Sequence, residues 1–470
     1  APARKHLVLR SDLRGTAIAL PAPLRKDADS TLPVRIALDL PVADSPLRVE
    51  LGRLLRADAH LPGTKPFAAA LGFGLAEPPQ MPANGLRIRG DVAALDLAGW
   101  SAIGGVDGGG GGFLDLELDA GVLDMFSREF PDTQVSIAPE DGGTRLRAKG
   151  PLIDGRVLLP ADRAAAGVTA EFEKLHFPEA RPGDASKPFD PGAMPPLHLW
   201  VKDLRFGKAQ LGDARVETFP SAGGMHVERL ETRTPNLEIR ARGDWATTEG
   251  RERSRFDATF TAEDLGRMLD TLGFAGMFEG GQTVATLRGE WPGSPAQFGL
   301  STTDGTLEIS VGKGRIPDVE PGMGRVFGLI SFQALPRRLS LDFSDFFGEG
   351  LAFDRITGTF ELRGGNAYTK DTVLKGPSVE IKVTGRTGLA AKDYDQVLDV
   401  TPKVGGVLPV VGALAAGPAG VAAGLVVQNV LSSPLKQIAR ARYTVKGGWD
   451  KPEIELVEKQ HPQRKRPQRG

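Results

Sequence analysis

Residues 86–92 read Leu-Arg-Ile-Arg-Gly-Asp-Val, and this short pattern decides the fold. Leucine, isoleucine, glycine and valine occupy every second position, and charged residues fill the positions between them. Successive side chains of a β-strand point to opposite faces. The pattern therefore predicts a strand with one apolar face and one charged face, and it places the glycine on the apolar face.

The same register recurs along the chain. Six further copies share the alternation and the glycine: Leu146-Ala148-Gly150-Leu152, Leu237-Ile239-Ala241-Gly243-Trp245, Leu287-Gly289-Trp291, Phe360-Leu362-Gly364, Val379-Ile381-Val383-Gly385 and Tyr443-Val445-Gly447-Trp449. In three copies a tryptophan follows the glycine by two residues and shares its face. A chain that reuses one strand unit is an array, so the repeat predicts an elongated structure.

Other segments extend the β-rich pattern. Alternation is also present at 34–40, 114–118, 307–311 and 339–343, which is typical of antiparallel strands that bury one face and expose the other. Helical spacing is limited to short segments at 263–272 and 323–332. We expect a mostly β protein built on a curled antiparallel sheet with a few short helices.

The repeated apolar faces have two possible roles. They could form the closed core of a sandwich or barrel, or they could line an open groove for apolar ligands. Periodicity alone does not distinguish these two arrangements.

Composition excludes some partners. The chain has 470 residues, a length typical of about three domains, although a stacked sheet can extend without a new core at each step. Lysine and arginine total 58 against 59 acidic residues, so the net charge of −1 gives no support for a nucleic-acid partner. Cysteine is absent, which fits an oxidising compartment but is compatible with any. The chain opens Ala1-Pro2-Ala3 without an initiator methionine, so we interpret it as the downstream part of a longer protein.

The sequence contains no recognisable catalytic, metal or cofactor motif. Its six histidines lack metal-ligand spacing, and the glycine run at 108–112 precedes a predicted strand, where a phosphate-binding loop would precede a helix. Asp342, Asp345 and Glu349 could ligate calcium, but we favour the simpler explanation that they are solvated charges at a strand edge. We therefore predict no enzymatic activity, no catalytic residue, no metal site and no cofactor.

The segment 404–435 is distinct because it contains no charged residue. Its length would allow a membrane-spanning helix, but Pro409 and Pro418 favour two shorter apolar helices. Basic residues follow at once at Lys436, Arg440 and Arg442.

Several motifs carry a family resemblance. They read Pro-Gly-Met-Gly-Arg-Val-Phe-Gly-Leu-Ile-Ser at 321–331, Leu-Pro-Arg-Arg-Leu-Ser-Leu-Asp-Phe-Ser-Asp at 335–345, Gly-Pro-Ser at 376–378, Asp-Tyr-Asp-Gln at 393–396, Leu-Pro-Val-Val-Gly at 408–412 and Gly-Pro-Ala-Gly at 417–420. In these motifs the chain resembles the C-terminal part of YhdP-type proteins, within the AsmA-like group that includes TamB. That group is similar to the bridge-like lipid-transfer proteins. The match is most specific from 261 to 452.

The resemblance implies a function and a location. It implies a long open β-groove in the periplasm of a Gram-negative bacterium, anchored in the inner membrane by a helix upstream of this chain. It also implies phospholipids as partners and non-enzymatic phospholipid transport towards the outer membrane. An apolar groove suits this role, since burying each lipid CH₂ group contributes about 0.8 kcal/mol. The alternative is a periplasmic scaffold that assists outer-membrane protein assembly through its strand edges.

Two sets of site residues follow. The residues predicted to line the lipid groove are Leu307, Ile309, Val311, Leu339, Leu341, Phe343, Val379, Ile381 and Val383. The residues predicted to contact the membrane are Leu408, Val411, Leu414, Leu425, Val426, Lys436, Arg440 and Arg442. The alternative for this second segment is a cap that closes the groove end.

We expect five segments along the chain. They are a repeated β-groove segment at 1–260, a C-terminal AsmA-like groove segment with short helices at 261–403, the apolar helical segment at 404–440, a final strand at 441–458 and a disordered basic tail at 459–470.

Overall fold

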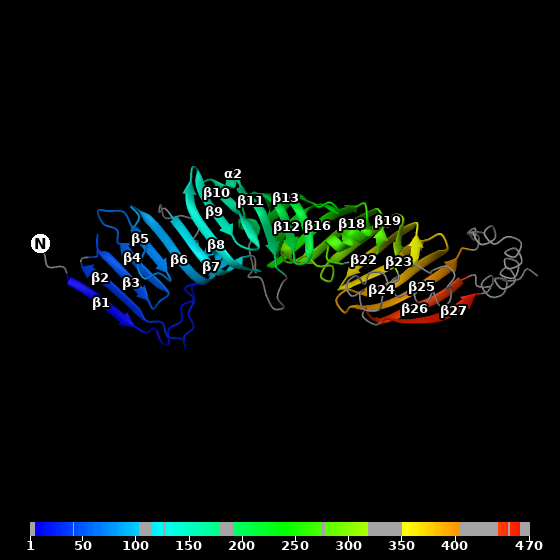
Figure 1. The fold of residues 1–470 in the computed structure, drawn as a ribbon, viewed down its shortest axis with the longest axis horizontal. Coiled ribbons are helices and arrows are strands. Elements are labelled where there is room, and N and C mark those ends of the chain that lie inside the picture. Colours follow the sequence, from blue (N-terminus) through cyan, green and yellow to red (C-terminus); the bar gives the residue numbers. More distant parts are fainter. Residues whose placement is uncertain are drawn as a thin grey trace, which may run out of the picture. The chain divides into compact units, whose positions relative to one another are not determined.

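The computed structural model describes residues 5–40, 42–102, 114–125, 128–178, 191–274, 278–317, 350–403, 440–449 and 452–460. The chain divides into two compact units, Ala1–Pro220 and Ser221–Gly470. Both units are built on β-sheet, which confirms that the protein is mostly β (Figure 1).

Unit 1 is a sheet in which each strand pairs with the next strand along the chain. Its strands are β1 (Lys5–Ser11), β2 (Val34–Leu40), β3 (Pro46–Leu51), β4 (Leu55–His60), β5 (Ala68–Phe73), β6 (Gly85–Asp96), β7 (Leu114–Met125), β8 (Arg128–Glu140), β9 (Gly143–Lys149), β10 (Ile153–Pro160), β11 (Val168–Phe177), β12 (Leu197–Phe206) and β13 (Ala209–Ser221). Short helices α1 (Leu97–Ala102), α2 (Arg163–Ala166) and η1 (Pro191–Ala193) lie in its connections.

Three strand pairs of unit 1 are parallel. They are β5–β6, β6–β7 and β11–β12. A parallel pair needs a connection that returns to the starting edge of the sheet, and here long connections such as 74–84 intervene. The sheet is therefore mostly antiparallel, with these three exceptions to the sequence-based expectation.

Unit 2 is a second run of strands, and all neighbouring pairs among its described strands are antiparallel. Its strands are β14 (Gly224–Arg233), β15 (Glu238–Thr248), β16 (Arg251–Ala262), β18 (Thr283–Pro292), β19 (Asp304–Val311), β22 (Arg355–Arg363), β23 (Asn366–Lys375), β24 (Val379–Gly388), β25 (Asp393–Pro402), β26 (Arg440–Gly448) and β27 (Glu453–Gln460). A small sheet contains β17 (Glu279–Gly280), β20 (Gly314–Ile316) and β21 (Leu351–Phe353). The helices in the described part of unit 2 are α3 (Leu265–Thr271) and η2 (Pro295–Gln297).

The antiparallel order gives the unit 2 sheet two different margins. At one margin, which we call the turn margin, lie the connections at 249–250, 293–303, 364–365 and 389–392, together with Trp449 just after β26. At the opposite margin the connections contain α3, β17, β20 and β21, and we call it the loop margin. Pro402 at the end of β25 and Arg440 at the start of β26 also lie at the loop margin.

Helix α3 confirms the helix expected at 263–272. Asp264 caps its N-terminus by accepting a hydrogen bond from the backbone N–H of Arg267 at 3.0 Å. Leu265, Met268 and Leu269 are buried on one side of the helix, as the spacing predicts. The helix expected at 323–332 and the apolar segment 404–435 lie outside the described residues.

Two further expectations need adjustment at the C-terminal end. The range 441–458, expected as one strand, holds β26 and most of β27, which pair as a hairpin. Residues 459 and 460, assigned to a disordered tail, are the last two of β27 and pair with Ala441 and Arg440. Residues 461–470 lie outside the described part of the chain.

At two of the recurring glycines, the neighbouring strand leaves no room for a side chain. Phe256 on β16 faces Gly243 on one side and Gly289 on the other. A Cβ added to Gly243 would lie 2.7 Å from the Phe256 ring. Gly385 has a φ of +123°, which side chains rarely adopt, and its added Cβ would lie 2.4 Å from the carbonyl oxygen of Asp395.

Candidate functional site

The predicted lining residues of unit 2 that the structure describes lie on one face of the sheet, which we call the apolar face. Cross-strand partners share a face, and a single line of partners runs from Val311 through Ile356, Leu374, Ile381 and Val400 to Ala441. Every member of this line is buried. The sequence-predicted residues of β19 and β24 are therefore brought onto one continuous surface by the strands between them.

The same partner lines divide the apolar face into rows. Counted from the turn margin, the rows on β24, β25 and β26 are Thr387–Tyr394–Gly447, Gly385–Gln396–Val445, Val383–Leu398–Tyr443 and Ile381–Val400–Ala441. We refer to these as the first to fourth rows. Since a strand rises about 3.3 Å per residue, the first and fourth rows are roughly 20 Å apart.

The lining side chains are packed against other protein side chains. Ile381 and Val383 are 0% exposed, and Leu307, Val311 and Val379 are also buried. Ile309 is partly buried and touches two buried clusters. Leu339, Leu341 and Phe343 lie outside the described residues.

The elements that cover the fourth row come from the loop margin. Leu265, Met268 and Leu269 of α3 belong to the same buried cluster as Ile381 and Val400. Ile316 of β20 and Leu351 and Phe353 of β21 belong to it as well. The structure therefore does not show an open groove at these positions, because α3 and the small sheet fill the space over the apolar face.

Unit 1 has an apolar face of its own, and no individual residue of it was predicted to line the site. Its buried cluster includes Leu118, Leu123, Phe130, Val135 and Ile153. Trp100 of α1 packs against this cluster, and its indole Nε1 donates to the carbonyl oxygen of Ala22 at 2.8 Å. The alternation at 114–118 was the available signal for this face.

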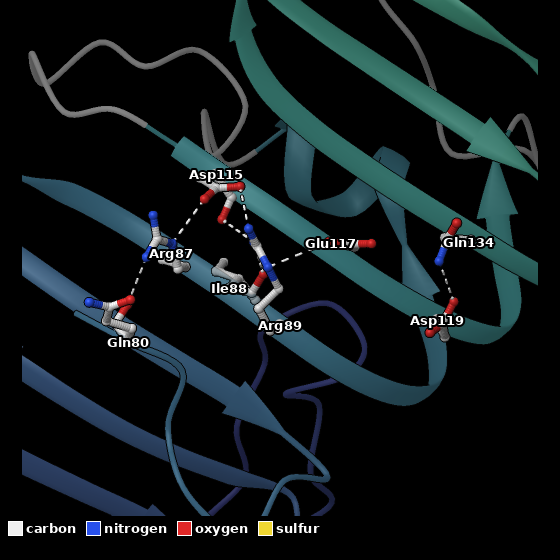
Figure 2. A network of polar contacts seen from close by, with 8 residues as sticks. All are labelled: Gln80, Arg87, Ile88, Arg89, Asp115, Glu117, Asp119 and Gln134. Carbon is white, nitrogen blue, oxygen red and sulfur yellow. Dashed lines mark hydrogen bonds and ion pairs between the residues drawn. The ribbon is translucent and has the colours of Figure 1, made fainter. Parts of the chain in front are cut away.

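The opposite face of each sheet carries the charges. In unit 1, Asp115 of β7 accepts hydrogen bonds from Arg87 Nε at 2.9 Å and Arg89 Nη2 at 2.7 Å, both on β6 (Figure 2). Burial alone would raise the pKa of Asp115, but the hydrogen bonds from Arg89 and Arg87 outweigh it and lower the pKa. Glu117 adds a second, longer contact to Arg89 at 3.6 Å.

Unit 2 repeats this arrangement on its charged face. Glu290 of β18 pairs with both Arg253 and Arg255 of β16, and hydrogen bonds from Arg255 and then Arg253 lower its pKa. Such pairs lie between adjacent strands and neutralise one another locally. The charged face therefore offers alternating signs across neighbouring strands, in agreement with the expectation of a solvated surface.

Two predicted membrane-contact residues are on the charged face and already have partners. Arg440 Nη2 lies 2.7 Å from Asp399, and Arg442 Nε lies 2.8 Å from it. Burial alone would raise the pKa of Asp399, but hydrogen bonds from Arg442 and Arg440 lower it. Leu408, Val411, Leu414, Leu425, Val426 and Lys436 lie outside the described residues, so membrane contact stays a prediction.

Sequence reasoning missed a set of polar side chains on the apolar face. Thr369, Thr372, Thr387 and Gln396 are each no more than 3% exposed. Gln396 Nε2 donates to Thr387 Oγ1 at 2.7 Å, and the Thr369 and Thr372 hydroxyls are 2.6 Å apart. The sequence signal was the two-residue spacing of Gln396, Leu398 and Val400, which places the three side chains on the same face of the strand.

The described ranges show no arrangement suited to metal chemistry. Within them, no group of three or more histidine, cysteine, aspartate or glutamate side chains is placed to hold a metal ion. His226 is hydrogen-bonded to Asp244 at 2.8 Å, and this bond is the main reason that its pKa is raised. None of the helices in the described ranges is long and apolar enough to cross a membrane.

The sequence model of the YhdP protein family matches residues 2–454, nearly the whole chain. The chain belongs to the YhdP family. It is 24% identical over 486 residues to a protein of Escherichia coli (strain K12) described as "Intermembrane phospholipid transporter YhdP". That alignment covers 98% of this chain and 38% of the relative, so the chain spans less than two fifths of the YhdP relative's length. No solved structure matches the chain.

Proposed function

We propose that this chain forms part of a non-enzymatic phospholipid conduit between the inner and outer membranes of a Gram-negative bacterium. The full-length protein would be held in the inner membrane by a segment outside this chain and would act in the periplasm. The observation that carries the proposal is the continuous line of buried apolar side chains from Val311 to Ala441 in a member of the YhdP family.

The proposed mechanism separates the two ends of a lipid. Acyl chains would lie on the apolar face, while headgroups would stay in water. Neighbouring side chains in the line are all aliphatic, so no position holds an acyl chain much more tightly than the next. Movement along the surface then needs no chemical step, in accord with the absence of catalytic motifs from the sequence.

Lipid entry requires the covering elements to move. Leu265, Met268 and Leu269 of α3 pack over the fourth row, and an acyl chain would have to replace their contacts. Each buried CH₂ group contributes about 0.8 kcal/mol, whether it belongs to the protein or to the lipid. We therefore propose that α3 and the small sheet move away from the apolar face when lipid enters. The apolar contacts of the acyl chains then replace the apolar contacts of these elements.

Site-specific photo-crosslinking tests the proposed function. Ile309 is partly buried on the apolar face, and Ser310, the next residue of β19, is exposed on the charged face. With a benzophenone amino acid at Ile309, phospholipid from vesicles should be captured, and the same group at Ser310 should capture little. Equal capture at the two positions would reject the proposal. Capture of a β-barrel protein without lipid would favour the assembly scaffold.

A further inference from the structure

At one margin of unit 1 the strands differ in length. β8 begins at Arg128, but its neighbour β9 pairs with it only from Gln134 onwards. At the same margin β11 ends at Phe177 and β12 ends at Phe206. Because β9 and β10 form a shorter hairpin, the start of β8 and the ends of β11 and β12 extend beyond it on either side.

Four side chains meet beyond this short hairpin, on the apolar face of unit 1. The ring centroids of Phe130 and Phe177 are 6.1 Å apart, and those of Phe177 and Phe206 are 5.2 Å apart. Arg128 lies two residues before Phe130 on β8 and therefore shares its face. Its Cζ is 5.7 Å from the centre of the Phe206 ring, which is within reach of a cation–π contact. We call these four residues the clasp.

The clasp joins strands that are far apart within the sheet. The pairing order runs from β8 through β9, β10 and β11 to β12. In a flat sheet β8 and β12 would be about 19 Å apart, since neighbouring strands are about 4.8 Å apart. The contact between Arg128 and Phe206 therefore requires the sheet to bend towards its apolar face. The clasp closes the concave side of this bend from one wall to the other.

Arg128 opposes the closed arrangement of the clasp. Its Nη1 is buried and has no hydrogen-bond partner among the described residues. A buried charged donor without a partner costs more free energy than a cation–π contact of a partly buried arginine returns. Water would satisfy this nitrogen if the clasp separated. The packing of the three phenylalanine rings therefore holds the clasp closed, and Arg128 weakens it.

The clasp is also the most accessible part of the buried cluster of unit 1. Arg128, Phe177 and Phe206 are only partly buried. By contrast, Leu123 and Val135 in the aliphatic part of the cluster are 0% exposed. Since the hydrophobic free energy follows the apolar area removed from water, separation at the clasp costs less than separation among the aliphatic side chains.

We propose that the clasp is a gate, which is closed in this structure and separates to admit acyl chains to the apolar face of unit 1. In the open gate, contacts between a ring and an acyl chain replace contacts between two rings. Nη1 of Arg128 then becomes accessible to water. This inference rests on the proposed function and adds a point of control to it.

Spin labels can measure the distance across the clasp, because the chain has no cysteine of its own. Glu129 on β8 and Gln210 on β13 are exposed, and cysteines at these positions accept nitroxide labels without altering the clasp. Pulsed electron paramagnetic resonance should give one short distance for the protein alone, and phospholipid vesicles should add a longer one. Labels at Val284 and Ser310, which face each other on β18 and β19, are the control and should keep one distance. An unchanged distance between positions 129 and 210 would overturn the gate.

Two substitutions should move the gate in opposite directions. Arg128→Met keeps an unbranched side chain that can contact the Phe206 ring, and it removes the unpaired nitrogen. The population with the longer distance should therefore fall roughly fivefold, the effect of about 1 kcal/mol. Phe206→Ala removes a ring from the clasp, so the longer distance should appear in the protein alone. A shift in the same direction for both variants would contradict the role given to Arg128.

A reversible lock separates failure of the gate from failure of the proposed function. In the protein alone, cysteines at positions 129 and 210 are joined by a cleavable bis-maleimide whose length matches the spin-label distance. A phospholipid with a diazirine in its acyl chain is then irradiated in vesicles with the locked or the cleaved protein, and mass spectrometry maps the labelled residues. Locking should reduce labelling of 172–177 and 199–206 roughly fivefold or more and leave labelling of 307–311 in unit 2 unchanged. Equal labelling of unit 1 before and after cleavage would refute the gate, and no labelling of either unit would refute the proposed function.

Discussion

Phe256 lies directly opposite Gly243 on the neighbouring strand, and its ring occupies the space that a side chain at Gly243 would need. The same phenylalanine stacks on Trp291, with ring centroids 5.3 Å apart. One copy of the repeated motif thus supplies a glycine that admits an aromatic ring, and the next copy supplies the tryptophan against which that ring packs. The glycine of the motif is a packing requirement in this pair of strands.

Gly243→Ala should destabilise unit 2 by roughly 2–3 kcal/mol, in the range expected of local backbone strain. Its Cβ would lie 2.7 Å from the Phe256 ring and closer still to the backbone carbonyl of Arg255, so the strands must separate. Gly250→Ala is the control, because a Cβ there meets nothing within 4 Å, although its φ of +72° adds about 1 kcal/mol of its own. Urea unfolding checks both, and equal losses would contradict this account.

Asp399→Asn should destabilise the protein by about 1–2 kcal/mol at neutral pH, a value reduced because both arginine partners are more than a third exposed. The pKa of Asp399 is lowered in the folded protein, so its contribution is present above the unfolded pKa. That contribution is lost as pH falls through the folded pKa.

The unfolding midpoints of wild type and Asp399→Asn should therefore converge in acid. Asp395→Asn is the matched control on the same strand and face, since Asp395 is exposed. A difference between wild type and Asp399→Asn that stays constant down to pH 2 would refute the ion-pair explanation.

His226 should titrate above its ordinary pKa, because Asp244 and, more weakly, Glu228 favour its charged form. A raised folded pKa contributes stability that is complete below the unfolded pKa and is lost as pH rises through the folded one. Proton NMR titration should show that the pKa of His226 falls further in Asp244→Asn than in Glu228→Gln. The stability gap between wild type and Asp244→Asn should be wider at pH 6 than at pH 8.5, and a gap that widens with rising pH would have the wrong sign.

Ile381→Ala should cost about 3 kcal/mol of folding free energy, because Ile381 is 0% exposed and its removal leaves a cavity. Ile309→Ala should cost less, since Ile309 is only partly buried against the same cluster. Chemical denaturation of the two variants measures the difference. A larger loss at Ile309 would show that the packing over the fourth row is looser in solution than in the structure.

The alternation of the sequence was enough to predict the faces of the sheet. Ile381, Val383 and Leu307 all lie on the apolar side, as expected, and Lys382 lies on the other. Alternation also predicted that Trp291 and Trp449 share the face of their glycines, and both pack against apolar neighbours. The face to which a side chain points depends only on its position along its own strand, so it can be predicted without knowing the partner strand.

What covers a face is not a local property. Periodicity placed Ile381 correctly but did not reveal that α3, more than 100 residues earlier in the chain, packs over its row. The parallel pairs β5–β6, β6–β7 and β11–β12 were missed because alternation looks the same in both pairing directions. Gln396 and Thr387 were missed because the motif was defined by its apolar members. The elongated shape stays a prediction.

The three parallel pairs also have a consequence for the rate of folding. In an antiparallel pair joined by a tight turn, the partner strand is available as soon as the turn closes, within microseconds for an isolated hairpin. β6, β7 and β12 each have to wait until a long connection has looped back, which increases the sequence separation of their contacts and slows their formation. Two antiparallel pairs of unit 2, β19–β22 and β25–β26, are separated by still longer stretches of chain, 312–354 and 403–439, so they should form later than the parallel pairs of unit 1.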